Sequence, residues 1–484
     1  LYAGQTILDG DVLYRDAFDQ KPPLIHFTFA LGLVLAGGSA WGPWLLELLA
    51  MATAGWLSFR LYRPIHGRAV AWSVTLIWML SLANLLERGG YTEPFTLPLQ
   101  FGSLLVFLKW IEAPEARRWP ILLGVLAGGA FLFRQNHVGI FVVSFVVAML
   151  LSGGARRAGS WLRAMSSVLL GVFAIWFPFA FYFSVHDAWS EFWDAAFHYN
   201  FLYTSISQAD RWGTFIFAIE RIPWSYVILP MWAGVVVHTV RTRSLHPGAR
   251  TSLLCVALVA LPLEYYLSSA SIKRYPHYFI LCLPVLSILL AELFAATQRL
   301  PGRMPRHRNL ARVALPVLIL ASLLSLDFGK LVKRYEAAAD PLTDSGYRRA
   351  IQFVGQNSNP DQTALVWGAD PVILALADRR SPSRFSWLYP LMARGFHLDR
   401  ITREFVDDVR ANPPAVIVDT AHPYFVNLDP RRREPVVLPD TVEARSLGPM
   451  SPIIEEFLGM VDREYVLIDS FDHVDVFVRR SEER

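Results

Sequence analysis

The stretch PHYFILCLPVLSILLAELFAA (276–296) is long and apolar enough to cross a lipid bilayer as a helix, which needs roughly 20 such residues. The rest of the chain has a similar character. Of its 484 residues, 54% are hydrophobic and 18% are charged. Globular proteins contain roughly 25% charged residues. The composition therefore predicts a polytopic α-helical membrane protein and disfavours every soluble class.

We predict about ten membrane spans. An apolar run at 24–37 is shorter than the roughly 20 residues that a span requires, and we interpret it as a helix lying in the membrane interface. The alternative is that this run is a further span. The predicted spans are residues 43–59, 69–86, 94–108, 119–133, 138–151, 164–183, 222–240, 252–269, 276–296 and 313–328.

Lysine and arginine residues are unevenly divided between the loops. If the spans alternate in direction, the loops on one side hold about twice as many as those on the other, and the positive-inside rule places the richer side in the cytoplasm. Counting 24–37 as a span would split the charged clusters between two sides, which favours the interfacial interpretation. The sparse loops that then lie outside are residues 1–23, 87–93, 134–137, 184–221 and 270–275.

The composition changes after residue 328, where the chain becomes polar and charged. Short β-branched runs alternate there with helical patterns, which predicts a small α/β domain. The predicted strands are 363–367, 415–419, 465–468 and 474–478, and the predicted helices are 347–355, 401–410 and 453–461. We thus expect three parts: an outer first loop with its interfacial helix (1–42), a transmembrane domain (43–328) and an extracytoplasmic α/β domain (329–484).

The first loop, LYAGQTILDGDVLYRDAFDQKPP (1–23), is densely charged and directly precedes an apolar run. Within it, Tyr14 and Arg15 precede Asp16, a candidate general base or metal ligand. Lys21 stands before two prolines and is a candidate partner for a phosphate. The alternative is an ordinary solvated loop with surface charges.

Two further outer loops carry ionisable groups at the ends of spans. The turn RGGYTEP (88–94) contains Arg88 and Glu93, and RQNH (134–137) contains Arg134 and His137. An ionisable group at the mouth of a span is a functional candidate. Structural alternatives exist for both loops: Glu93 precedes Pro94 and matches the dipole of a helix N-terminus, and an arginine commonly anchors a helix at the interface.

The segment SIKRYPHY (271–278) brings cations and hydroxyl groups into a span together. Lys273 and Arg274 stand at the mouth of the predicted helix, and His277 and Tyr278 fall inside it. Two cations and a histidine at one membrane mouth suit a lipid phosphate through charge-assisted hydrogen bonds. Simple interfacial anchoring is the alternative.

Several of these motifs form a family pattern. The segment LDGDVLYRDAFDQKPPL (8–24) resembles the first outer loop of the polyprenol-phosphate-sugar-dependent glycosyltransferases of the GT-C superfamily. The similarity is greatest to the branch that holds the bacterial relatives of protein mannosyltransferases and of the aminoarabinose lipid A transferase. RYPHYFILCLPVLSILLA (274–291) and the downstream α/β domain resemble the same group.

The resemblance implies a function. A sugar would pass from a polyprenyl-phosphate donor to a hydroxyl group of a lipid, glycan or protein acceptor, outside a bacterial plasma membrane. Lys21 and Arg274 match phosphate-site candidates of the family, and Glu93 matches an acid of its second loop. Membrane lipids are expected partners and nucleic acid is not. The metal requirement stays open, since loop acids can hold Mg²⁺ or Mn²⁺ without a diagnostic spacing.

The resemblance also implies that residues precede Leu1. The usual catalytic aspartate of the family lies just before the segment matched by Tyr2 and Ala3, so we expect that base and the first span to lie upstream. The alternative function is a transporter of lipid-linked glycans, or a receptor that reads ligands through the outer domain. A transporter would place charged groups within its spans along a path, whereas here most charges lie at the outer mouths.

Overall fold

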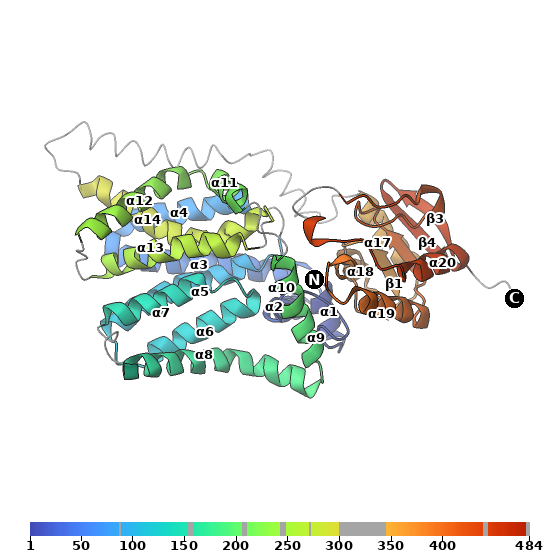
Figure 1. Ribbon diagram of the computed structural model, residues 1–484, viewed down its shortest axis with the longest axis horizontal. Coiled ribbons are helices and arrows are strands. Elements are labelled where there is room, and N and C mark those ends of the chain that lie inside the picture. Colours follow the sequence, from blue (N-terminus) through green and yellow to red (C-terminus); the bar gives the residue numbers. More distant parts are fainter. Residues whose placement is uncertain are drawn as a thin grey trace. The chain divides into compact units, whose positions relative to one another are not determined.

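The computed structural model describes residues 1–86, 89–152, 158–205, 211–242, 248–270, 273–299, 345–438 and 444–480 (Figure 1). It divides into two compact units. The first unit combines Leu1–Pro43, Tyr182–Ala209 and Glu336–Arg484, and the second combines Trp44–Phe181 and Asp210–Tyr335. The predicted first loop and the predicted C-terminal domain therefore fall in one unit.

The second unit is built from helices that pack around a large apolar core. In chain order its elements are α3 (Trp41–His66), α4 (Arg68–Leu85), α5 (Glu93–Glu112), α6 (Arg118–Phe133), α7 (Gly139–Leu151), most of α8 (Ala158–Val185), α11 (Arg211–Arg221), α12 (Ser225–Thr242), α13 (Ala249–Ser268), the 3-10 helix η3 (Pro276–Cys282) and α14 (Leu283–Arg299). Each predicted span between residues 43 and 296 coincides with a helix. The predicted span 313–328 lies outside the described residues.

Among the described residues, five segments are long and apolar enough to cross a membrane, and the number of ten spans stays a prediction. These segments are Arg68–Leu85, Glu93–Glu112, Ala158–Val185, Ala249–Ser268 and Pro276–Ala296. In the most apolar stretch of Pro276–Ala296, 89% of the residues are buried, against 11% in Ala158–Val185. Pro276–Ala296 is therefore a central helix, and α8 presents most of its apolar surface outward.

Hydrogen bonds between polar side chains join elements of the second unit, including the central helix. Tyr62 on α3 and Ser287 on α14 share a hydrogen bond of 2.7 Å between their hydroxyl oxygens. Trp224 donates from its indole Nε1 to the hydroxyl of Ser81 on α4, at 2.7 Å. Between helices with similarly apolar surfaces, such hydrogen bonds and close packing supply the attraction that the hydrophobic effect does not.

Small residues let α6 and α8 approach closely. A Cβ atom on Gly171 would overlap the carbonyl oxygen of Ile121, and one on Gly124 would overlap that of Val168. Only glycine allows two helix backbones to meet at this distance. The pair follows the small-residue packing that is common between membrane helices.

The first unit contains an α/β domain formed by the C-terminal residues. Its strands β1 (Ala364–Trp367), β2 (Val416–Asp419), β3 (Tyr465–Phe471) and β4 (Val474–Arg479) form one sheet in the order β1-β2-β4-β3. β1 and β2 are parallel, whereas β4 is antiparallel to both of its neighbours. Each strand coincides with one of the four strands predicted from the sequence.

Helices cover both faces of β1 and β2, whose residues are all buried. The helices predicted from the sequence are present as α17 (Ser345–Asn357), α19 (Leu398–Ala411) and α20 (Ile454–Glu464). The remaining elements of this domain are α18 (Val372–Ala377), the short 3-10 helices η4 (Tyr389–Met392), η5 (Pro430–Arg432) and η6 (Ala444–Ser446). Two covered faces explain why β1 and β2 are continuous apolar runs.

The first loop is part of the same unit and contacts the α/β domain directly. Helix α1 (Tyr2–Leu8) places the Tyr2 hydroxyl where it accepts a hydrogen bond from the Ser381 amide at 2.8 Å. The Phe18 amide donates to the carbonyl oxygen of Arg384 at 2.9 Å, and the Arg384 guanidinium donates to the carbonyl oxygen of Tyr14 at 3.1 Å. Hydrogen bonds from both backbone and side-chain groups thus hold the loop against the α/β domain.

Helix α2 (Leu24–Leu35) follows the loop and packs against α1, where a Cβ atom on Gly4 would lie 2.9 Å from the backbone nitrogen of Ala30. It has 12 residues, fewer than the roughly 20 that a span requires. The predicted shortness of this helix is confirmed, and its interfacial position stays a prediction.

The Asp419 carboxylate at the end of β2 predicts a pH dependence of the domain's stability. It accepts hydrogen bonds from the amides of Ala421 and Leu428, each at 2.8 Å, but its burial raises its pKa to about 6 from the ordinary value of 3.8. Between these values the folded state binds more protons than the unfolded state. The free energy of unfolding should therefore fall as the pH rises from 4 to 6, by up to about 3 kcal/mol.

This slope is measurable by hydrogen exchange of the β2 amides in the full chain, corrected for the intrinsic pH dependence of exchange. Asp419→Asn should remove it. Asp472→Asn is the matched control, because Asp472 is exposed in the turn between β3 and β4. An unchanged slope in Asp419→Asn would assign the pH dependence to another group.

Candidate functional site

Two loops of the second unit meet around the Glu93 carboxylate. Glu93 begins α5, Arg134 follows the last residue of α6, and His137 precedes α7. The Arg134 guanidinium donates to Glu93 Oε1 at 2.9 Å, and His137 Nε2 lies 3.7 Å from the same oxygen. The motifs at 88–94 and 134–137, separate in the sequence, therefore form one ion-pair cluster.

Hydroxyl groups fix the remaining polar atoms of this cluster. The Thr92 hydroxyl donates to Glu93 Oε2 at 3.1 Å. His137 Nδ1 and the Thr96 hydroxyl lie 2.8 Å apart, one turn into α5. The Glu93 side chain is 1% exposed, whereas that of Arg134 is 22% exposed. The cluster thus buries its acid and leaves part of its cation accessible.

The segment 273–278 joins the cluster through its aromatic rings. The Arg134 guanidinium carbon lies 4.1 Å from the ring centroid of Tyr278, a cation–π contact. His277 stacks on Tyr91 with ring centroids 3.9 Å apart, and on Tyr275 at 5.6 Å. The motif at 134–137 and the segment 273–278 are therefore neighbours in space.

The two cations at the start of this segment differ in exposure. Lys273 is buried and Arg274 is exposed. Arg88, a further predicted site residue, lies outside the described residues. Of the sequence-predicted candidates, the second unit brings Glu93, Arg134, His137, His277 and Tyr278 together.

Two buried acids near these loops were missed in the sequence. Glu47 on α3 accepts a hydrogen bond from the Gly90 amide at 2.8 Å, which holds the 88–94 turn. Glu264 on α13 accepts one from the Ile140 amide at 2.6 Å, at the start of α7. Each is a single acid inside an apolar run. This placement alone could have identified both residues as functional candidates from the sequence.

The first unit holds the other predicted residues, beginning with Tyr14, Arg15 and Asp16. Tyr14 is fully buried with a backbone φ of 70°, a conformation uncommon for non-glycine residues, and its hydroxyl donates to the carbonyl oxygen of Lys21 at 2.7 Å. The Asp16 carboxylate accepts from the Val12 amide and from the Arg15 guanidinium, both at 2.8 Å. These contacts close the turn of the first loop.

Lys21 lies in a second, smaller ion-pair group. Its ammonium donates to Asp19 Oδ1 at 3.2 Å, and His26 Nε2 lies 3.9 Å from the same oxygen. Burial raises the pKa of Asp19, but the charges of Lys21 and His26 and the hydrogen bonds from Lys21 outweigh it and hold that pKa at about 2. The Lys21 side chain stays 41% exposed, so its charge is accessible to a ligand.

The sequence matches a known family model. The model is described as the putative competence-induced protein Ccs4 N-terminal domain, and it matches residues 1–326. The chain belongs to this family. The Ccs4 N-terminal domain match includes the first loop and all of the Glu93 cluster, and it ends before the α/β domain. A search of curated proteins found no match.

Solved structures with the same fold extend the comparison to the α/β domain. ArnT from Cupriavidus metallidurans in the apo state aligns with a TM-score of 0.60 and 14% identity, covering 98% of this chain and 92% of that chain. The structure of the same enzyme bound to undecaprenyl phosphate aligns with a TM-score of 0.58 and 16% identity, covering 99% and 92%. This member of the Ccs4 N-terminal domain family therefore has an ArnT-like, GT-C-like fold, as its sequence motifs predicted.

Proposed function

We propose that the protein is a membrane glycosyltransferase that moves a sugar from a polyprenyl-phosphate donor to an acceptor hydroxyl. The observation that carries the proposal is the fold shared with ArnT over nearly the whole chain, together with an accessible cation in the Glu93 cluster. One of the ArnT structures was solved with undecaprenyl phosphate. The proposed acceptor is a lipid, glycan or protein on the outer side of a bacterial plasma membrane.

In the proposed reaction the acceptor oxygen attacks the anomeric carbon of the sugar. The bond between that carbon and the phosphate oxygen breaks, and the electron pair leaves with the lipid phosphate. A carboxylate takes the proton of the acceptor hydroxyl. Fixed cations stabilise the charge that develops on the phosphate, and they are most effective where water is excluded.

Arg134 is our first candidate to bind the phosphate, supported by Lys273, Arg274, His277 and Tyr278 in the neighbouring segment. Arginine offers a planar set of donors that matches phosphate oxygens. Its side chain is 22% exposed, so a ligand can reach it, while the buried Glu93 fixes its position.

The contacts of the two candidate acids, Glu93 and Asp16, support a positioning role. Both oxygens of Glu93 are occupied, one by Arg134 and one by Thr92. These are the contacts of a positioning residue, and its alternative role as the general base stays a prediction. The same holds for Asp16, whose oxygens accept from Arg15 and Val12. A divalent cation, Mg²⁺ or Mn²⁺, also stays a prediction.

The test uses the full chain in liposomes with a panel of polyprenyl-phosphate sugars, each with and without EDTA. Donor consumption in the presence of an acceptor would support the transferase, and loss of it in EDTA would support the metal. Glu93→Gln and Arg274→Ala should both slow transfer, and unchanged rates in both would place the site elsewhere. Movement of intact donor across the bilayer without its consumption would instead favour the transporter.

Lys21→Met separately tests whether Lys21, in the first unit, contributes to donor binding. Methionine keeps much of the apolar stem but removes the charge, and a hydrogen bond to a charged group contributes about 1.5–3 kcal/mol. We expect KM for the donor to rise roughly 10–100-fold, since each 1.36 kcal/mol corresponds to a factor of ten. Steady-state kinetics at several donor concentrations measure this change.

Lys109→Met is the matched control for Lys21→Met. Lys109 also pairs with a carboxylate, that of Glu112, but at the opposite end of α5 from Glu93. Its replacement should leave KM unchanged. An equal effect of both variants would mean that general surface charge, and not a Lys21 contact, determines donor affinity.

A further inference from the structure

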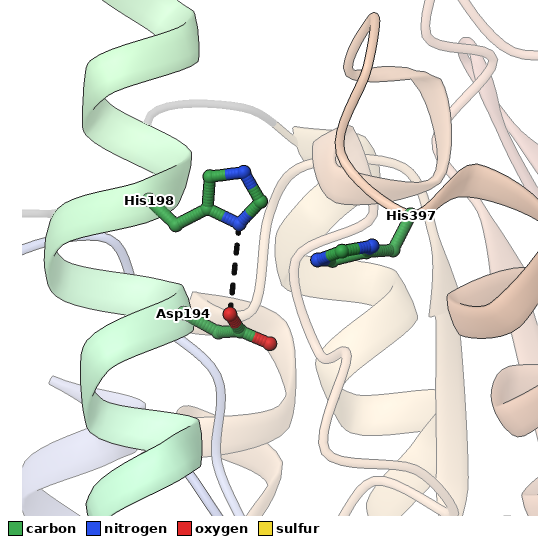
Figure 2. Close-up of side chains that lie close together, drawn as sticks. All are labelled: Asp194, His198 and His397. Atoms are coloured by element: carbon green, nitrogen blue, oxygen red, sulfur yellow. Dashed lines mark ion pairs between the residues drawn. The ribbon is translucent and has the colours of Figure 1, made fainter.

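Asp194, His198 and His397 bring three potential metal ligands together in the first unit (Figure 2). Their ligand atoms all lie within 4.8 Å of one another. The side chains of Asp194 and His198 project from the same face of one helical segment, and His397 approaches from a loop of the α/β domain, as Figure 2 shows. The proposed transfer reaction uses none of the three.

The local backbone at these residues is unusual. Asp194–His198 is a single turn of π-helix, η2, between α9 (Trp189–Trp193) and α10 (Tyr199–Ser205). Such turns are rare and frequently occur at functional sites. His397 directly precedes α19 and has a φ of 43°, a left-handed conformation that few non-glycine residues adopt. Two independent backbone irregularities therefore coincide at the three side chains.

Neighbouring contacts already orient the ligand atoms. Arg400 donates to Asp194 Oδ2 at 2.9 Å, and the other oxygen, Oδ1, lies 3.5 Å from His198 Nδ1. The guanidinium thus holds one carboxylate oxygen and directs the second toward the imidazole. Metal-binding carboxylates are commonly fixed by an outer hydrogen bond of this kind.

Aromatic packing holds the two segments beside each other. Phe396 contacts the rings of Tyr199 and His198, with centroids 5.1 and 5.6 Å apart. The rings of His198 and His397 are 4.9 Å apart. Because Phe396 adjoins His397 in the chain, this packing fixes the position from which His397 reaches the other two side chains.

We propose that Asp194, His198 and His397 form a binding site for a divalent transition-metal ion of the Zn²⁺ class. Two imidazole nitrogens and one carboxylate oxygen suit Zn²⁺, whereas Mg²⁺ and Ca²⁺ prefer oxygen ligands. Tetrahedral Zn²⁺ with bonds of about 2.0–2.1 Å places its ligand atoms roughly 3.3 Å apart. The Asp194–His198 pair is close to that spacing, and His397 completes the site by rotating its side chain inward.

Three protein ligands leave a fourth position for water. The ion would replace the ion pair between Asp194 and His198 and connect the helical segment Trp189–Ser205 to the α/β domain. Both segments belong to the first unit, so the ion would crosslink two parts of that unit.

The test measures metal binding directly and needs no sugar donor. The full chain is equilibrated with Zn²⁺, dialysed and analysed for bound metal, and Co²⁺ is used as a second probe because its visible absorption reports tetrahedral coordination. We expect binding of one ion that depends on these three residues. His198→Ala and His397→Ala should each weaken it by at least the roughly 10–100-fold that outer-shell changes cost.

His473→Ala is the matched control, since His473 is an exposed histidine of the same domain outside the group. It should bind as the unaltered chain does. His198→Gln, which keeps a polar side chain of similar reach, covers the case in which the alanine variant does not fold. Equal Zn²⁺ affinity in the His198 and His397 variants, or a Co²⁺ spectrum without tetrahedral bands, would overturn the proposal.

Discussion

Replacing Glu93 by glutamine is expected to lower kcat/KM for the polyprenyl-phosphate donor by at least about 100-fold. Glutamine keeps the shape of the side chain but removes the negative charge that holds the Arg134 guanidinium at 2.9 Å. Removing one partner of a buried pair costs about 3–5 kcal/mol, and each 1.36 kcal/mol is a factor of ten in rate. Donor consumption at several concentrations measures the loss and separates kcat from KM.

Glu264→Gln is the matched control for Glu93→Gln. Glu264 is also fully buried in the second unit, but its carboxylate accepts from a backbone amide, which glutamine can also bind. Transfer should therefore persist.

A double-mutant cycle tests whether Glu93 acts through Arg134. If it does, Glu93→Gln combined with Arg134→Ala should cost little more than Arg134→Ala alone, as for residues that act as a unit. Additive losses would show that Glu93 has a separate role, such as that of the general base.

The second large effect is expected in the α/β domain, where Trp367→Ala should destabilise the fold by about 3–5 kcal/mol. The Trp367 side chain is fully buried at the end of β1 and stacks on Phe457 with ring centroids 4.9 Å apart. Its indole Nε1 donates to the carbonyl oxygen of Val426 at 2.8 Å. Alanine removes these ring contacts and leaves that carbonyl without its donor.

Hydrogen exchange of the β1 and β2 amides in the full chain measures this destabilisation. Exchange should become about 100-fold faster or more, since 1.4 kcal/mol corresponds to a factor of ten. Trp367→Phe keeps an aromatic ring against Phe457 and should have a smaller effect. Val437→Ala, at a position that is 85% exposed, should have none. Slow exchange in Trp367→Ala would mean that α19 and α20 are held to the sheet by other contacts.

The secondary structure of this protein was largely predictable because it depends on local patterns. Buried strands require short β-branched runs, and each of the four observed strands coincides with a predicted one. The predicted apolar spans between residues 43 and 296 likewise coincide with α3 to α8, with α12 and α13, and with η3 and α14. Local patterns did not predict the contacts of charged residues inside such runs, as with Glu47 and Glu264.

The candidate site was predictable only as separate motifs. Each had a local signal, namely charged residues at the end of an apolar run. Which motifs meet depends on how the helices pack. Glu93 begins α5, whereas Arg134 and His137 lie between the end of α6 and the start of α7, and packing of these helices brings the three residues together. The sequence contains no signal that His397 would reach Asp194 and His198, since the two segments are distant in the chain.

The sequence by itself determined the class of protein, the apolar helices, the four strands, and the GT-C-like fold suggested by the first loop. These follow from hydropathy, from the period of apolar residues, and from a motif that can be read within a few residues. Only the tertiary structure decided that Phe18 and Tyr14 of the first loop are bound by Arg384 of the α/β domain, and that Glu93 is buried against Arg134. The physical reason is that such contacts depend on the path of the backbone between them, which no local pattern encodes.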